Sequence, residues 1–401
     1  MTQLSACLHR VNPSILNPDR LAPIDAAIEA FIARKQMPGA VYWLERRQGH
    51  ETATYQNAYG RHTYDANAER ITLDTVFDAA SLTKVIATAP SVMMLIDEGK
   101  LNIDTPLIEY FPECAGGGKQ AITLRHLLTH TSGLAAGLPS TPPWRGETAA
   151  LALACKQSVT HPPGTFFRYS DINFTLLGLL VQKLSGMSLD RFAKQRLFDP
   201  LGMRDTGYLP LGNIDLTRIA PTQQLLDRST QKLQGDLADG GVLRGVVHDP
   251  AVRFMGGVGG SAGVFTTVAD IAKYARMILN DGVVVNADGS DGKRILSRES
   301  MRLMREAQSP VGIPQLRSAG WDINSPISRP RGSVFPIGSF GHTGFTGCIL
   351  WIESGTQTFY VFLSNRVYPN DRGNILDLYG QLGTLSAQAV AGVNYAAPSA
   401  K

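Results

Sequence analysis

Cysteine is scarce in this chain, with four residues among 401. The four lie far apart and form no Cys-x-x-Cys pair: Cys7, Cys114, Cys155 and Cys348. This distribution indicates neither a disulfide framework nor a zinc site, and it fits a reducing compartment. We expect no metal and no other cofactor.

The chain also lacks a strong charge imbalance and any long apolar run. It has 38 basic and 34 acidic residues, a net charge of +4, and no dense basic block that would indicate a nucleic-acid partner. Its N-terminus shows no basic segment followed by an apolar core of about 7–15 residues, as a signal peptide would. The longest apolar run, residues 85–96, contains Pro90 and is too short to cross a bilayer. These features predict a cytoplasmic protein without a membrane span, and they leave its oligomeric state open.

The stretch that is most informative covers residues 77–100, FDAASLTKVIATAPSVMMLIDEGK. Ser81 and Lys84 stand three residues apart at the start of an apolar helix, so they share one helical face. An amine whose pKa is lowered by burial or by a neighbouring cation can serve as the base for a serine nucleophile. Unpaired N–H groups at the helix start can then receive the oxyanion that forms. The alternative is that Ser81 simply caps the helix.

Ser-x-x-Lys occurs at two other places, Ser229…Lys232 and Ser290…Lys293. Both lie in polar or turn-forming sequence, which would not hold the two side chains on one helical face. Only the pair Ser81…Lys84 is followed by an apolar helix, so it is the candidate catalytic pair.

A second candidate group precedes the predicted helix at residues 174–185. Tyr169 can act as an acid or base at the edge of a cleft if a cation lies near it. Asp171 or Asn173 could orient the lysine or contact substrate. A single tyrosine in this position is equally consistent with a buried aromatic that packs before a helix.

A third group, His342-Thr343-Gly344, lies on a predicted strand. Small residues there would let a substrate lie along the strand edge and use its backbone hydrogen bonds. The alternative is an ordinary strand in which the glycine has only a structural role.

The order of elements predicts an α/β fold with two lobes. Helical periodicity at residues 21–35 and 374–390 and strand patterns near both ends of the chain indicate one sheet completed by both termini. The middle of the chain is mostly helical. We expect an α/β lobe at about 20–85 and 262–395 and a helical lobe at about 86–261, within a single catalytic domain. The predicted strands cover residues 40–46, 51–59, 340–344, 348–353 and 359–365.

Taken in order, these groups resemble the three motifs of the serine β-lactamase and penicillin-recognising superfamily: Ser81-Leu-Thr-Lys84, Tyr169-Ser-Asp171 and His342-Thr-Gly344. The resemblance covers roughly residues 20–390 and is strongest to class C β-lactamases, DD-peptidases and family VIII carboxylesterases. It implies a β-lactamase-like fold, an antiparallel sheet flanked by helices with a helical lobe. It also implies catalysis by Ser81, Lys84 and Tyr169, with the N–H groups of Ser81 and Phe345 as the oxyanion hole.

Two positions depart from the family pattern. Asp171 replaces the usual asparagine of the second motif, and His342 replaces the lysine that is common in the third. Histidine is partly neutral at pH 7, so it is a weaker partner for a substrate carboxylate.

One further serine needs consideration, because Gly259-Gly-Ser261-Ala-Gly263 matches the G-x-S-x-G nucleophile elbow. The elbow requires a strong strand directly before the serine, and residues 253–260 are glycine-rich. Ser261 is therefore interpreted as a turn residue. His126 and His130 lack the glutamate of a zinc motif and are interpreted as structural.

We expect a serine hydrolase that forms an acyl-enzyme on Ser81 and acts on small esters. The residues expected to bind substrate are Asp171, Asn173, His342, Thr343 and Gly344. A DD-carboxypeptidase or a weak β-lactamase is the alternative, and a penicillin-binding module without catalysis is a remote one.

Overall fold

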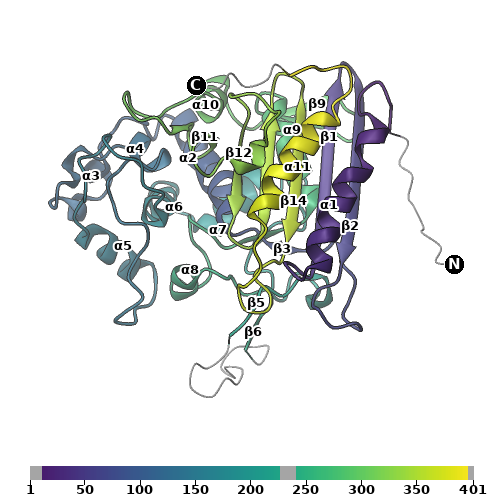
Figure 1. The fold of residues 1–401 in the computed structure, drawn as a ribbon. Coiled ribbons are helices and arrows are strands. Elements are labelled where there is room, and N and C mark those ends of the chain that lie inside the picture. The colour runs from purple at the N-terminus through teal and green to yellow at the C-terminus, as the bar shows by residue number, and fades with distance from the viewer. Residues whose placement is uncertain (1–10, 226–240, 396–401) are drawn as a thin grey trace.

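The computed structural model describes residues 11–225 and 241–395 of the chain. A seven-stranded antiparallel sheet forms one lobe, and most of the helices form the other (Figure 1). The strand order is β10-β11-β12-β13-β14-β1-β2, so the sheet joins both ends of the chain. Its strands are β1 (Gly39–Gln48), β2 (Glu51–Gly60), β10 (Leu316–Arg317), β11 (Asp322–Asn324), β12 (Phe340–Gly344), β13 (Cys348–Glu353) and β14 (Thr358–Ser364). The predicted sheet and fold class are confirmed.

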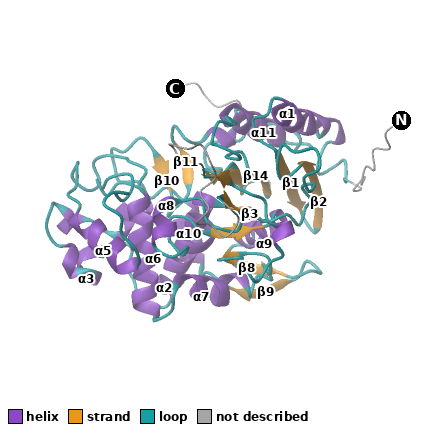
Figure 2. Ribbon diagram, turned by 90° about the horizontal axis from the view of Figure 1, so that it is seen from below, coloured by secondary structure: helices purple, strands orange, loops and turns teal. Residues whose placement is uncertain are grey.

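Helices cover both faces of this sheet. Amphipathic α1 (Ala22–Ala33) and α11 (Leu376–Gln388) pack side by side on one face, as Figure 2 shows, and enclose a buried apolar cluster. On the other face lies α9 (Val268–Leu279), which is capped by Thr267, whose side chain accepts from the N–H of Asp270.

The helical lobe is built from short helices and several small strand pairs. Its helices are α3 (Leu107–Tyr110), α4 (Leu124–Leu128), α5 (Glu147–Lys156), α6 (Asp171–Ser185), α7 (Leu189–Ala193) and α8 (Pro250–Phe254), and α10 (Arg298–Arg305) packs against α2. The minor strands are β3 (Phe77–Asp78), β4 (Gly207–Tyr208), β5 (Gln223–Gln224), β6 (Val242–Leu243), β7 (Val264–Thr266), β8 (Val283–Val285) and β9 (Asp291–Arg294). Before β3, residues 71–76 form no strand apart from an isolated bridge at Val76.

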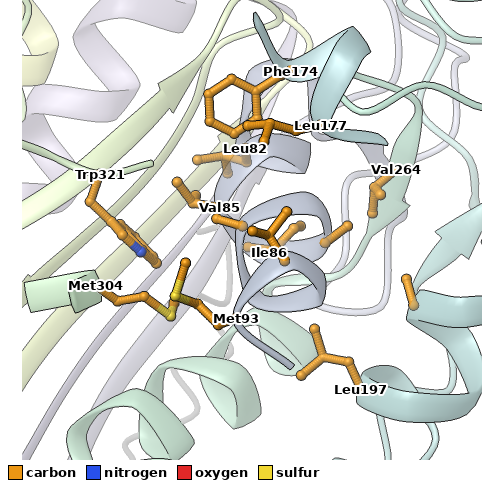
Figure 3. Close-up of a cluster of buried hydrophobic side chains, with 14 of the residues drawn as sticks. Leu82, Val85, Ile86, Met93, Phe174, Leu177, Leu197, Val264, Met304 and Trp321 are labelled. Atoms are coloured by element: carbon orange, nitrogen blue, oxygen red, sulfur yellow. The ribbon is translucent and has the colours of Figure 1, made fainter. Parts of the chain in front are cut away.

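A central helix runs between the lobes and starts at the candidate serine. It begins as a 3₁₀ turn at Ala80–Leu82, continues as a π turn at Lys84–Thr88 and becomes α2 (Ala89–Asp97). The π turn ends just before Pro90, whose missing N–H cannot complete a regular helix. Apolar side chains surround the helix on all sides (Figure 3). The stretch Ala80–Asp97 is apolar enough to span a membrane, but 83% of it is buried, as in the core helix of a folded domain.

One expectation from cysteine spacing is wrong. Cys114 and Cys155 form a disulfide although they are 41 residues apart in sequence. The end of α5 packs against the 3₁₀ turn Pro112–Cys114, and this contact brings the two cysteines together. The spacing of the two cysteines in the sequence does not predict this contact. Cys348 is free and buried, and Cys7 lies outside the described residues.

The other Ser-x-x-Lys matches have different outcomes. Ser290 and Lys293 lie in the β8–β9 hairpin, so they do not share a helical face, as predicted. Ser229 and Lys232 lie outside the described residues.

Candidate active site

Ser81 lies at a sharp turn between β3 and the central helix. Ala80, directly before it, has a φ of 46°, which is uncommon for a residue with a side chain. The buried carboxylate of Asp78 holds this turn by accepting from the N–H groups of Ala80, at 2.8 Å, and His248, at 2.7 Å. Burial raises the pKa of Asp78 to about 6. The turn leaves Ser81 half-buried at the start of the helix, with its hydroxyl accessible.

Lys84 is completely buried, and its amine contacts three oxygen atoms. Nζ donates to Ser81 Oγ at 3.0 Å and to the carbonyl oxygen of Ser261 at 2.8 Å, and it lies 2.7 Å from Asp171 Oδ1. The amine thus donates two hydrogen bonds and forms an ion pair with a carboxylate, surroundings that favour a charged lysine. The structure therefore brings the predicted serine and lysine together, with the ammonium directed at the serine hydroxyl.

The charge of Lys84 bears on which residue takes the proton of Ser81. Burial acts to lower the pKa of Lys84, but Asp171 and Tyr169 more than offset burial and raise the pKa above that of an ordinary lysine. The condition for a lysine base, a lowered pKa, is not met because a carboxylate contacts the amine.

Tyr169 lies beside this amine, between two imidazole rings. The centre of its ring is 5.0 Å from Lys84 Nζ, 4.4 Å from the ring of His130 and 5.9 Å from that of His342. Burial, followed by the charge of Arg317, holds the pKa values of both histidines well below the usual range. Both imidazoles are therefore neutral at pH 7, and the Tyr169 ring lies between them beside the Ser81–Lys84 pair.

The two polar residues after Tyr169 have different surroundings. Helix α6 begins at Asp171, three residues earlier than predicted, so both residues lie in its first turn. The Asp171 side chain is 37% exposed and faces the cleft. Asn173 is fully buried, and its side-chain oxygen accepts from the Ser132 hydroxyl at 2.7 Å. The structure thus places Asp171 at the site and Asn173 behind it, where it fixes the loop that carries Ser132.

The third motif lies on β12, directly against the serine turn. A Cβ at Gly344 would lie 2.4 Å from the carbonyl oxygen of Ala79, so only glycine permits this approach. The Thr346 hydroxyl donates to the carbonyl oxygen of Asp78 at 2.7 Å and ties the following turn to the same segment. The backbone of Phe345 is thereby held beside Ser81, where its N–H and that of Ser81 can serve a shared oxyanion.

The side chains of this motif are distributed unevenly. His342 is buried, and its Nδ1 lies 2.8 Å from the carbonyl oxygen of Thr343. Thr343 is half-buried and lines a surface pocket together with Gly344 and Phe345. The Phe345 ring is half-exposed between His248 and Arg366. Of the motif, Thr343 and the backbone are accessible to a substrate, while His342 supports the site from behind.

Sequence reasoning missed the role of the segment around Ser261. Gly260 packs against α6 so closely that a Cβ would lie 2.0 Å from the carbonyl oxygen of Phe174, and its own carbonyl accepts from Thr88 at 2.7 Å. This contact places the Ser261 carbonyl on Lys84. The G-x-S-x-G match drew attention to the Ser261 hydroxyl, whereas the functional group here is its backbone. His126 caps α4 and His130 packs on Tyr169, so the two histidines do not form a metal pair.

Comparison with known proteins identifies the family. The Beta-lactamase family model matches residues 24–384. A protein of Escherichia coli (strain K12) with the name "Putative D-alanyl-D-alanine carboxypeptidase" is 28% identical over 347 residues, covering 78% of this chain and 75% of the relative.

Two solved structures share the fold at low sequence identity. The octameric penicillin-binding protein homologue from Pyrococcus abyssi matches with a TM-score of 0.68 and 20% identity, over 92% of this chain and 79% of that one. EstCE1, a hydrolase with promiscuous acyltransferase activity, matches with a TM-score of 0.68 and 20% identity, over 93% and 98%. Together with the Ser81–Lys84 geometry, these findings show that the chain is a hydrolase and belongs to the Beta-lactamase family.

Proposed function

We propose that this protein is a carboxylesterase that cleaves small esters through an acyl-enzyme on Ser81. The observation that carries the proposal is the contact of Ser81 Oγ with a buried, charged Lys84 at 3.0 Å. The ammonium fixes the serine hydroxyl and favours negative charge on it as it attacks.

The chemistry proceeds in two balanced steps. Ser81 Oγ bonds to the ester carbonyl carbon and passes its proton to the phenolate form of Tyr169, which becomes a neutral phenol, while the N–H groups of Ser81 and Phe345 hold the oxyanion. The carbon–alkoxide bond then breaks, and the alcohol leaves with that proton. Water attacks the acyl-enzyme in the same manner and releases the carboxylic acid. Tyr169 is assigned as the base because the raised pKa of Lys84 keeps its amine protonated.

The charges at the site favour esters over substrates that carry a carboxylate. The imidazole of His342 is neutral and buried, so it supplies no accessible cation. Asp171 adds a carboxylate where the family more often has an amide. Arg366, near Phe345, is already paired with Asp371 at 2.5 Å. A neutral ester encounters none of the repulsion from Asp171 that an anionic peptide end or a β-lactam carboxylate would.

A DD-carboxypeptidase is the second candidate, supported by the name of the E. coli relative. The Cys114–Cys155 disulfide also favours it, because disulfides persist mainly in oxidising compartments, where cell-wall peptides occur. The cytoplasmic location predicted from the sequence stays a prediction. Alkylation of free thiols directly in intact cells, followed by mass measurement, would show whether these cysteines are paired there.

One substrate panel tests the proposal. We expect kcat/KM for ethyl butyrate to exceed that for a D-Ala-D-Ala tripeptide and for a chromogenic cephalosporin. An alkyl ester is needed because an aryl ester has an activated leaving group. A higher value for the tripeptide would replace the esterase proposal with the DD-carboxypeptidase. Absence of covalent labelling by a fluorophosphonate would instead indicate a module without catalysis.

A further inference from the structure

A small cavity opens beside the catalytic amine. Its volume is about 200 Å³, and its lining includes Asp171 and Ser261, both of which contact Lys84. Lys84 in turn contacts Ser81, so two residues of the cavity lining are linked to the nucleophile through one amine. Pockets that take drug-sized ligands measure roughly 300–1,000 Å³, so this one suits only a short group.

A larger apolar cavity lies on the other side of one aromatic residue. It measures about 600 Å³, and Phe254 lines both cavities. The remaining lining is mostly aliphatic, with two arginines, and includes Leu209, Leu211, Val246, Val247, Arg145 and Arg253. The small cavity therefore ends at Phe254, although apolar space continues behind it.

The wall between the two cavities is held firmly. The rings of Trp144 and Phe254 meet edge to face with centres 5.4 Å apart. Trp144 Nε1 donates to the carbonyl oxygen of Pro139 at 2.7 Å, and the N–H of Gly146 donates to the carbonyl oxygen of Phe254 at 2.8 Å. The Trp144 ring is thus held by the Pro139 carbonyl and by the Phe254 ring, and the backbone of Phe254 is tied to the segment that follows Trp144.

We propose that the Trp144–Phe254 pair limits the length of the acyl chain, so that the enzyme takes esters of short, uncharged aliphatic acids. This inference rests on the proposed esterase function and specifies its substrate class. The acyl group occupies the small cavity because it stays attached to Ser81 through both chemical steps, whereas the alcohol leaves after the first. The Asp171 carboxylate in the cavity lining excludes acyl chains that end in a carboxylate.

Two ester series and four proteins test this inference. One series keeps ethanol and lengthens the acid from two to ten carbons, and the other keeps acetate and lengthens the alcohol. The proteins are the wild type, Trp144→Ala, Phe254→Ala and Trp43→Ala. Trp43 is the matched control because it is a half-buried tryptophan that lines neither cavity and donates to Glu45.

We expect wild-type kcat/KM to fall at least about tenfold from ethyl butyrate to ethyl octanoate, since one methylene in a pocket is worth about 10–200-fold. Trp144→Ala and Phe254→Ala should raise the octanoate-to-butyrate ratio at least about tenfold, because Phe254→Ala joins the two cavities and Trp144→Ala enlarges the small one. Trp43→Ala should leave this ratio unchanged. If an alanine variant does not fold, the corresponding leucine variant should show the same trend more weakly.

Three results would overturn the inference. The first is a wild type that prefers octanoate, and the second is an octanoate-to-butyrate ratio that neither wall variant changes. The third is a shift confined to the alcohol series, which would place the alcohol in the cavity. A wild type that cleaves no ester in either series would overturn the proposed function itself, and this outcome is distinct from the other three.

Discussion

Two serines contact the same buried amine, and they do so with different groups. Ser81 meets Lys84 Nζ with its hydroxyl at 3.0 Å, and Ser261 meets it with its backbone carbonyl at 2.8 Å. Ser81 is half-buried at the start of a helix, whereas Ser261 is only 2% exposed and follows a run of glycines. Both segments look like nucleophile motifs in sequence. The difference shows that the local motif does not identify the nucleophile. The nucleophile is the serine that contacts the lysine through its hydroxyl, Ser81, and not the one that contacts it through its backbone carbonyl, Ser261.

The largest effect should come from removing the amine that both serines share. Lys84→Met keeps the length of the side chain and removes its charge and its donors. We expect kcat/KM for ethyl butyrate to fall by at least ~10⁴-fold, as much as for Ser81→Ala, because members of one catalytic unit are strongly non-additive. Thermal unfolding of both variants controls for folding. Wild-type rates for Lys84→Met would contradict the Ser–Lys assignment.

A smaller effect should follow from disturbing the Ser261 segment through its backbone. In Gly260→Ala the new Cβ would lie 2.0 Å from the carbonyl oxygen of Phe174, so the segment must move. We expect a loss of about 1–3 kcal/mol in the free energy of unfolding, as for other overpacked cores, and at least a tenfold loss in kcat/KM. At Gly207 a Cβ meets no heavy atom within 4 Å, so Gly207→Ala is the control. Equal stability of the two variants would contradict the close packing of Gly260.

Asp171→Asn should change the pH dependence of the rate. Burial lowers the pKa of Lys84 while Asp171 and Tyr169 raise it, and the net shift is upward. Removing the carboxylate therefore lowers this pKa, and the ammonium is lost as pH rises above neutrality. We expect kcat/KM of the variant to fall relative to that of the wild type as pH rises above neutrality, because the variant loses its ammonium at a lower pH.

The opposite outcome has a distinct meaning. A faster Asp171→Asn enzyme at neutral pH would indicate that neutral Lys84, rather than Tyr169, takes the proton of Ser81. The pH–rate profile from pH 5 to 10 distinguishes the two cases.

The smallest effect should come from Ser261→Ala. The variant loses a hydroxyl but keeps the carbonyl that contacts Lys84. We expect kcat/KM to stay within about twofold of the wild type, as for a substitution away from the reacting atoms. A loss as large as that of Lys84→Met would show that the Ser261 hydroxyl takes part in the chemistry.

Periodicity and motif order predicted five strands of the main sheet, helices α1 and α11, and the three segments that meet at the site, but not the short edge strands β10 and β11. These features depend on local pattern, and local pattern is visible in a sequence. The sequence did not predict the Cys114–Cys155 disulfide or the role of the Ser261 carbonyl, because both depend on the packing of segments distant in sequence. The sequence also predicted that Asn173 contacts the substrate. Where each residue of α6 points depends on the residue at which the helix begins, and sequence patterns do not locate that residue precisely enough.

The raised pKa of Lys84 illustrates the same limit. Burial was foreseen, but its effect was outweighed by Asp171, whose distance from the amine is a tertiary property. A motif indicates which residue types lie together. Only the distances between them determine whether burial or the neighbouring carboxylate has the larger effect on the pKa of the lysine.

The most direct test of the account is to find which serine becomes acylated. The wild type, Ser81→Ala and Ser261→Ala would be treated with a fluorophosphonate, and the adduct would be located by peptide mass spectrometry. The account predicts one adduct on the peptide that contains Ser81, the same adduct in Ser261→Ala, and none in Ser81→Ala. An adduct on Ser261, retained in Ser81→Ala, would contradict it.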